Sequence, residues 1–191
     1  MNKWKVGFFL LAGLVAAGIS AVIVLVSSSN ESVPFPEMNA LNMTDNVLTV
    51  NATKENLEGI ANTYIRKAMK GEPIPVTMKV DDEVLLFSEM TMFSLTFPVI
   101  MHFDPFVHDD GNLILKLSKM EIGKLNILPS AILKVLKDSV KLPTWMSVRP
   151  KEEEIFINLS EIPVSGNLQV RAKTFNLAED EIILEIIIPN E

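Results

Sequence analysis

The segment FSLTFPVIMHF, residues 93–103, decides the fold class. Its odd-numbered positions are all large and apolar, whereas the even-numbered ones, apart from Ile100, are not. Because side chains alternate between the two faces of a strand, the pattern predicts a long β-strand with one strongly apolar face. Pro98 lacks an N–H group and predicts an edge position or a β-bulge within that strand.

The sequence on either side supplies partners for this strand. Residues 109–111, Asp-Asp-Gly, predict a hairpin turn, and residues 113–117 return with Leu at alternate positions. Before residue 93, the runs 76–80 and 84–88 flank an acidic turn and predict another hairpin. The centre of the chain is therefore expected to be an antiparallel meander.

Two amphipathic helices are expected around the meander. Thr53 is a predicted N-cap, apolar residues then recur at helical spacing up to Met69, and Gly71 ends the helix. A second helix follows Pro129, and two hairpin arms occupy residues 168–188. The order of helix, strands, helix and strands predicts an α+β fold with a curved antiparallel sheet.

The apolar strand faces are predicted to line the interior, with Ile60 and Ile65 of the first helix packed nearby. A core and a ligand groove both fit this composition, because methionine-rich walls adapt to variable acyl chains and also fill ordinary cores. The predicted groove residues are Phe93, Leu95, Phe97, Val99, Met101, Phe103, Leu113, Leu115 and Leu117.

An N-terminal membrane anchor is expected at residues 6–26, which contain no charged residue and are long enough to span a bilayer as a helix. Lys3 and Lys5 precede it, so the positive-inside rule makes residues 1–5 a cytoplasmic tail. Residues 27–52 are polar and contain prolines, which predicts a tether, with a short strand in 47–50. Residues 53–191 are then an extracytoplasmic domain at the cell membrane.

Composition excludes several classes of function. The chain has no cysteine, so disulfides, thiolate metal sites and thiol nucleophiles are excluded. The net charge of the chain is −7, and two of its 17 basic residues precede the first acidic residue, Glu31, so the outer part carries −9. A domain this acidic is not expected to bind nucleic acid, which requires neutralisation of phosphates.

Residues 102–110 hold both histidines of the chain together with three aspartates. His102, Asp104 and His108 are weak candidates for metal ligands, because imidazole nitrogens and carboxylate oxygens bind divalent ions. The plainer interpretation is a turn built by aspartates beside a solvent-facing histidine. No catalytic motif for a hydrolase, zinc protease or phosphate-binding loop is present, so we expect neither an enzyme nor a cofactor.

Three segments resemble YpmS-like proteins of Gram-positive bacteria: the helix at 54–69, residues 115–125 (LKLSKMEIGKL) and residues 128–133 (LPSAIL). The resemblance extends over essentially the whole chain and implies a membrane-anchored protein, without naming catalytic residues. The order of elements is also similar, at the level of fold alone, to tubular lipid-binding modules.

The expected function is a non-enzymatic module that binds lipids or lipid-linked envelope amphiphiles, held on the bilayer by its N-terminal helix. The alternative is an envelope scaffold that recruits a partner enzyme through its acidic or apolar surface.

Overall fold

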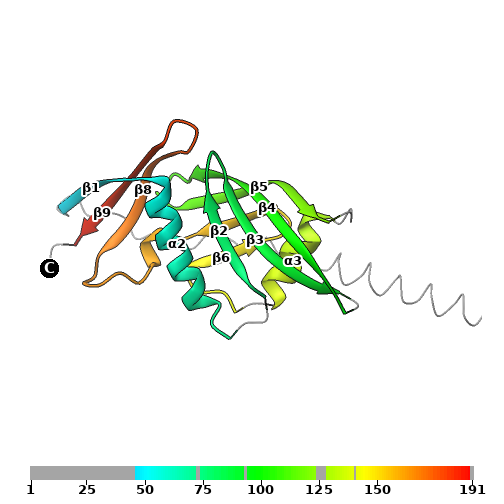
Figure 1. The fold of residues 1–191 in the computed structure, drawn as a ribbon. Helices are drawn as coiled ribbons and strands as arrows, with labels where there is room; N and C mark the ends of the chain where they lie inside the picture. Colours follow the sequence, from blue (N-terminus) through cyan, green and yellow to red (C-terminus); the bar gives the residue numbers. More distant parts are fainter. Residues whose placement is uncertain (1–45, 72–73, 93, 124–127, 140, 190–191) are drawn as a thin grey trace, which may run out of the picture. The chain divides into compact units, whose positions relative to one another are not determined.

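The computed structural model describes residues 46–71, 74–92, 94–123, 128–139 and 141–189 (Figure 1). The chain divides into two units after residue 34, and all described residues belong to the second unit, 35–191. The predicted tail and anchor (1–26), most of the tether, and Phe93 lie outside the described residues. Among the helices that are described, none has the length and apolar character needed to cross a membrane.

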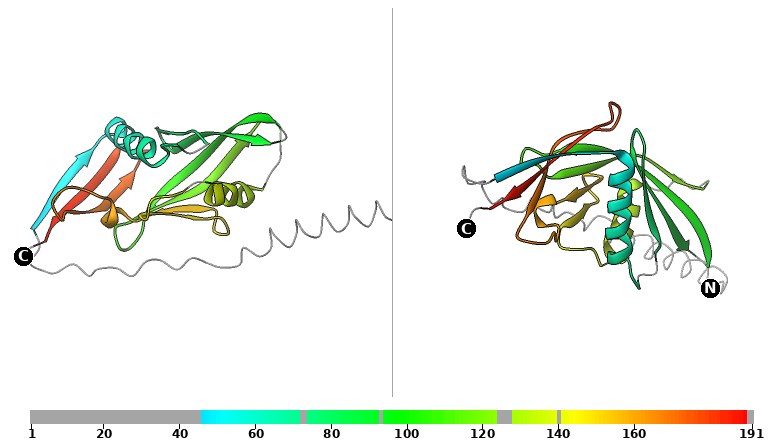
Figure 2. Two further views of the ribbon diagram at one scale, coloured as in Figure 1. Left: turned by 90° about the horizontal axis from the view of Figure 1, so that it is seen from below. Right: turned by 60° about the vertical axis from the view of Figure 1, so that its left-hand side comes forward.

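The larger of two sheets has six antiparallel strands in the order β2-β3-β4-β5-β7-β6, and it curves around the core (Figure 2). Its consecutive central strands are joined by short turns, as the alternating pattern predicts. The strands are β2 (Val76–Val80), β3 (Val84–Met92), β4 (Leu95–Val107), β5 (Leu113–Ile122), β6 (Met146–Arg149) and β7 (Glu154–Ile157).

The smaller sheet has the order β1-β9-β8, from β1 (Asn46–Ala52), β9 (Glu181–Ile188) and β8 (Gln169–Asn176). The strand predicted at 47–50 is therefore present and longer, and it pairs with β9 over its full length. The folded domain thus begins at residue 46 or earlier rather than at 53. Sequence placed these residues in the tether because their strand partner lies about 135 positions away, so no local pattern reveals the pairing.

The prolines of β4 explain how a central strand tolerates residues without an N–H group. Pro98 pairs with Glu89 of β3, but the ladder with β5 begins only at Val99. Pro105 pairs with Leu115 of β5, after the ladder with β3 has ended at Phe103. Each proline lies where β4 has one neighbour, so no ladder hydrogen bond is lost. The expected edge strand or bulge at Pro98 is wrong.

The actual irregularity lies opposite His102 and Phe103, where the register with β5 shifts. His102 pairs with Lys119 and Phe103 with Leu117, which leaves Ser118 as the extra residue. Its hydroxyl donates to the carbonyl of His102 at 3.1 Å. Such a bulge bends and twists the sheet locally, which helps it to curve around the core.

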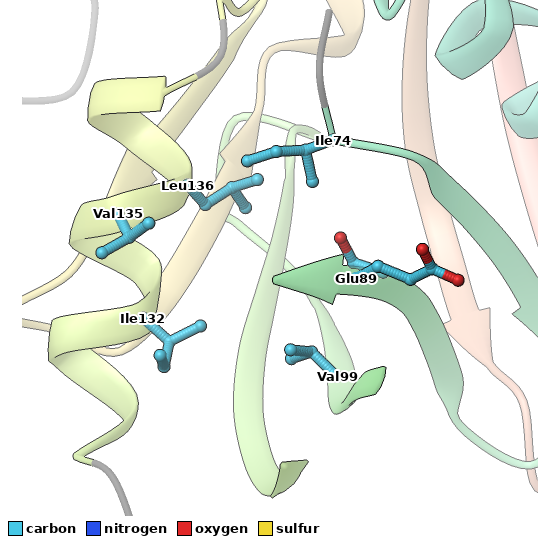
Figure 3. Close-up of a pocket in the computed structure, with 7 residues that line it drawn as sticks. Ile74, Glu89, Val99, Ile132, Val135 and Leu136 are labelled. Atoms are coloured by element: carbon cyan, nitrogen blue, oxygen red, sulfur yellow. The ribbon is translucent and has the colours of Figure 1, made fainter. Parts of the chain in front are cut away.

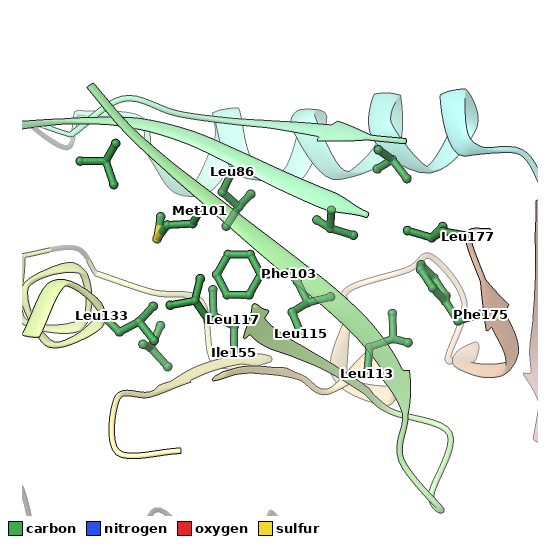
Figure 4. Packing of buried hydrophobic residues seen from close by; sticks show 14 of the residues in the cluster. Leu86, Met101, Phe103, Leu113, Leu115, Leu117, Leu133, Ile155, Phe175 and Leu177 are labelled. Atoms are coloured by element: carbon green, nitrogen blue, oxygen red, sulfur yellow. The ribbon is translucent and has the colours of Figure 1, made fainter. Parts of the chain in front are cut away.

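The core lies on the concave side of the larger sheet and continues to the smaller one (Figure 4). Phe103 is completely buried at its centre. Leu117 of β5 and Leu133 of the second helix are buried in the same cluster, which also includes Phe175 of β8. The alternating apolar faces predicted from sequence therefore meet in one shared interior.

Helix α2 (Lys54–Ala68) covers the free edge of β2 rather than a sheet face. Thr53 caps the helix as predicted, accepting from the N–H of Asn56 at 3.2 Å. The Asn62 side chain both accepts from the N–H of Met78 (2.8 Å) and donates to its carbonyl (2.7 Å). These bonds occupy an edge that otherwise invites pairing with another chain.

This placement corrects the expected packing of α2. Ile60, predicted to face the interior, is exposed, and Ile65 is half-buried. The helix contacts a strand edge, which is narrower than a sheet face. Only part of its apolar stripe is therefore covered, with Leu57 packed against the core.

The turn between β4 and β5 connects the two sheets. It forms at the predicted Asp-Asp-Gly, with Gly111 at φ 82°, and the carbonyl of Gly111 accepts from Ala172 of β8 at 2.7 Å. A Cβ on Gly111 would lie 2.7 Å from the Cβ of Arg171, so only glycine fits there. The side chain of Asn112 accepts from the N–H of Leu159, in the short helix η1 (Leu159–Glu161), at 2.8 Å.

Candidate functional site

Helix α3 (Pro129–Ser139) forms one wall of an apolar slot on the concave side of the larger sheet. Ile132 and Leu133 are buried, and the helix packs against β6. Its apolar residues extend round the helix beyond this contact, because Val135 is 40% exposed. The helix thus carries more apolar surface than its packing with the sheet covers.

The slot lies between α3 and the strands β3 and β4 (Figure 3). Its enclosed volume is about 20 Å³, enough for a single water molecule. Figure 3 shows the carboxylate of Glu89 pointing away from α3, so the walls that face the helix are apolar. The lining residues are Ile74, Ser88, Glu89, Val99, Ile132, Val135 and Leu136.

Exposed apolar residues gather at the end of the sheet next to the slot. Because neighbouring strands are antiparallel, the end of β3, the start of β4 and the end of β5 meet there (Figure 1). Leu95 is 61% exposed at the start of β4, and Leu128, just before α3, is 68% exposed. With Val135 they surround this end of the domain with uncovered apolar surface.

The predicted groove residues divide between core, slot and surface. Five of them, Met101, Phe103, Leu113, Leu115 and Leu117, are buried in the core, and Phe97 is half-buried against it. Val99 is buried and lines the slot. Leu95 does not line the interior, because it precedes the β4–β5 ladder, which begins at Val99, and has no core beneath it.

Four apolar residues of the slot were not among the predicted groove residues: Ile74, Ile132, Val135 and Leu136. A signal for the three on α3 existed in the sequence. A helix that covers one sheet face needs an apolar stripe about 100° wide, and this helix is apolar over more of its circumference. The excess indicates a second apolar contact.

The candidate metal ligands are not brought together. His102 lies between two carboxylates, with Nδ1 2.7 Å from Glu83 Oε1 and Nε2 3.5 Å from Glu121 Oε1. Asp104 is exposed and pairs across the strands with Lys116. Over the described ranges, no group of three metal-binding side chains converges.

Charge pairing around His102 has the character of a surface network. The Lys119 ammonium lies 2.6 Å from Glu121 Oε1, and this hydrogen bond lowers the pKa of the Glu121 carboxyl. The carboxylates of Glu83 and Glu121 meet opposite nitrogens of the imidazole ring, so they do not point at a common centre. This arrangement orients His102 on the outer face of the sheet.

His108 belongs to the structural turn between β4 and β5. Its Nδ1 lies 2.9 Å from Asp110 Oδ1, and its ring contacts Phe156 edge to face. Burial of Asp110 acts to raise the pKa of its carboxyl, but hydrogen bonds from the Asn112 N–H and from His108 outweigh burial. The pKa of Asp110 therefore lies below its ordinary value of 3.8.

This shift predicts acid sensitivity that Asp110→Asn removes. A carboxyl whose pKa is depressed by folding stabilises the fold above its unfolded pKa, and this contribution is lost as pH falls through the folded pKa. The difference in unfolding free energy between the wild type and Asp110→Asn should therefore shrink between about pH 5 and pH 2. Urea titrations across this range measure it, with Asp109→Asn as the control for charge loss in the same turn. Parallel curves for wild type and Asp110→Asn would contradict the prediction.

The described residues define an α+β domain with a curved antiparallel sheet, two helices and an apolar slot beside α3. The chain matches the family described as "Uncharacterized protein conserved in bacteria (DUF2140)" over residues 2–188, and it belongs to that family. It is 29% identical, over 185 residues and 95% of each chain, to "Uncharacterized protein YpmS" of Bacillus subtilis (strain 168). The resemblance to YpmS-like proteins is thus confirmed. No solved structure matches the chain.

Proposed function

We propose that this protein is a membrane-anchored, extracytoplasmic module that binds lipids or lipid-linked amphiphiles without catalysing a reaction. The observation that carries the proposal is the apolar slot beside α3, which opens next to the uncovered side chains of Leu95 and Val135. Ligand sites for apolar molecules are concave and mostly apolar, with few polar groups. The walls of the slot that face α3 have this character.

The energetics favour an acyl chain as the occupant. Burial of each methylene contributes about 0.8 kcal/mol, so roughly eight carbons contribute about 6 kcal/mol. The slot has a volume of only about 20 Å³, so an acyl chain enters as α3 moves away from β3 and β4. The apolar surface that this movement uncovers is then buried again by the ligand.

The position at the membrane follows from the N-terminal sequence. The anchor at 6–26 and the basic residues Lys3 and Lys5 support a cytoplasmic N-terminus and an outer domain. Protease added to intact spheroplasts is expected to digest the domain, with a cytoplasmic protein as the control for intact membranes. Full protection of the domain would contradict this orientation.

Lipid content of the purified domain tests the binding proposal. Residues 35–191 form a compact unit of their own and should yield lipid on organic extraction, detected by mass spectrometry. Val135→Glu places a charge at the slot and should lower the lipid content several-fold. Val50→Glu in β1 is the matched control, because Val50 is 38% exposed and Val135 40%.

Two results would contradict lipid binding at the slot. The first is a monodisperse wild-type domain that carries no lipid. The second is a Val135→Glu variant that stays folded by circular dichroism and retains as much lipid as Val50→Glu.

A scaffold that recruits an envelope enzyme is the second candidate, and strand β1 favours it. Val47, Leu48 and Val50 are exposed apolar residues in a strand at the edge of its sheet. Exposed edge strands pair readily with a strand of another protein. A lipid-free domain that captures a partner, and loses it with Val50→Glu, would favour this function.

A further inference from the structure

The apolar end of the larger sheet has a chemistry of its own beyond the slot. Leu128, Leu95 and Val135 are among the nine large apolar residues that the described part of the chain leaves most exposed. Leu128 and Val135 are seven positions apart, so they lie on the same flank of α3. Burying this surface against water-excluding material would be favourable.

Positive charge is concentrated in the same region. Residues 116–141 contain six lysines and two acidic residues, which gives +4 in a chain whose total is −7. Lys137 and Lys141, in α3 and just beyond it, are exposed, and Lys134 lies on the same helix. The rest of the chain therefore carries −11, and the polarity of charge between this region and the remainder is strong.

We infer that the end of the domain marked by Leu95, Leu128 and Val135 docks onto an anionic lipid surface. Exposed apolar side chains enter the acyl boundary while neighbouring lysines bind phosphate head groups, as in interfacial amphipathic helices. The acidic remainder of the domain is repelled from the same surface, so charge also sets the orientation.

Chain length is consistent with this occupant. The proposed anchor ends at residue 26 and β1 begins at Asn46, so 19 residues join them. A fully extended segment of this length reaches roughly 65 Å, which lets the domain touch the bilayer in many orientations. Docking selects one of them.

The docking inference rests on the proposed function in one respect: it places the opening of the slot against the bilayer. An acyl chain would then pass between leaflet and slot without crossing water. This gives the ligand a source, the outer leaflet itself. An anionic phospholipid is accordingly the chemical class of the surface that is recognised.

The absence of cysteine from the chain allows a site-specific test. Full-length Leu128→Cys is labelled with an environment-sensitive fluorophore and reconstituted into vesicles of phosphatidylcholine with or without phosphatidylglycerol. Nitroxides on the lipid acyl chains should quench this label several-fold more strongly in the phosphatidylglycerol vesicles. Leu48→Cys, an exposed leucine of β1, is the matched control and should stay unquenched in both.

Lysine variants test the electrostatic part. Each lysine near an anionic surface strengthens binding about fivefold, so Lys137→Gln and Lys141→Gln together should weaken docking by about 25-fold. Equal quenching at positions 128 and 48 in phosphatidylglycerol vesicles would overturn the inference. Shielding of the label that rises with protein density in both vesicle types would also overturn it, because a second copy of the chain would then cover the patch.

Val135→Cys repeats the measurement at an independent position in case a label at 128 disturbs the start of α3. The lipid content of residues 35–191 is measured separately, so the two proposals fail separately. Quenching without extractable lipid supports docking and contradicts the slot. Extractable lipid without quenching supports the slot and contradicts docking.

Discussion

Replacing Phe103 with alanine is expected to lower the free energy of unfolding of residues 35–191 by about 3–5 kcal/mol. Phe103 has no exposed surface and lies at the centre of the core, between strands and helix α3 (Figure 4). Truncation removes the burial of the ring and leaves a cavity that rigid strands on both sides of β4 cannot fill. Urea unfolding followed by circular dichroism measures the change.

Phe106→Ala is the matched control, because the same residue type on the same strand is 52% exposed there. Its expected change is within about 0.5 kcal/mol. A Phe103→Ala variant as stable as Phe106→Ala would contradict the burial that the structure assigns to β4. The ratio of the two effects, rather than either alone, is the informative quantity.

Local periodicity predicted most of the fold. The alternation in 93–103 corresponds to β4, and the leucines at 113–117 occupy the core face of β5 as predicted. Thr53 and Gly71 marked the limits of the first helix because capping and positive φ are local properties. Features of this kind depend on a few neighbouring residues, so one sequence is sufficient to predict them.

Pairing between distant residues was beyond the local pattern. The place of β1 in the smaller sheet depends on β9, more than a hundred positions away, and alternation within 46–52 does not reveal it. The exposure of Leu95 likewise depends on where β5 ends. Alternation predicts which face a side chain occupies, but the partner strand decides whether anything covers that face.

The candidate site shows the same division. Val99 was predicted from its strand face, whereas Ile74 and Leu136 line the slot because α3 packs against β6 and leaves a gap beside β3 and β4. The orientation of a helix over a sheet results from the sum of its contacts. No single residue in the sequence encodes it.

Replacing Arg149 with methionine is expected to destabilise residues 35–191 by about 3–5 kcal/mol. The guanidinium lies 2.7 Å from Glu154 Oε1, across the β6–β7 ladder, and the side chains are only 11% and 12% exposed. Glu152 Oε1 lies 3.7 Å from the same guanidinium. Without the cation, the Glu154 carboxylate stays buried beside a second carboxylate, which is the costly part of breaking such a pair.

Two further variants separate the cost of a stranded charge from the value of the pair itself. Arg149→Met combined with Glu154→Leu removes both charges and should recover most of the lost stability, because apolar replacements of buried ion pairs are often neutral. Lys79→Met breaks an exposed pair with Asp81, 3.5 Å apart, and should cost at most about 1 kcal/mol. Urea unfolding of the three variants gives the comparison. If the double variant is no more stable than Arg149→Met, burial of the Glu154 charge is not the cause of the loss.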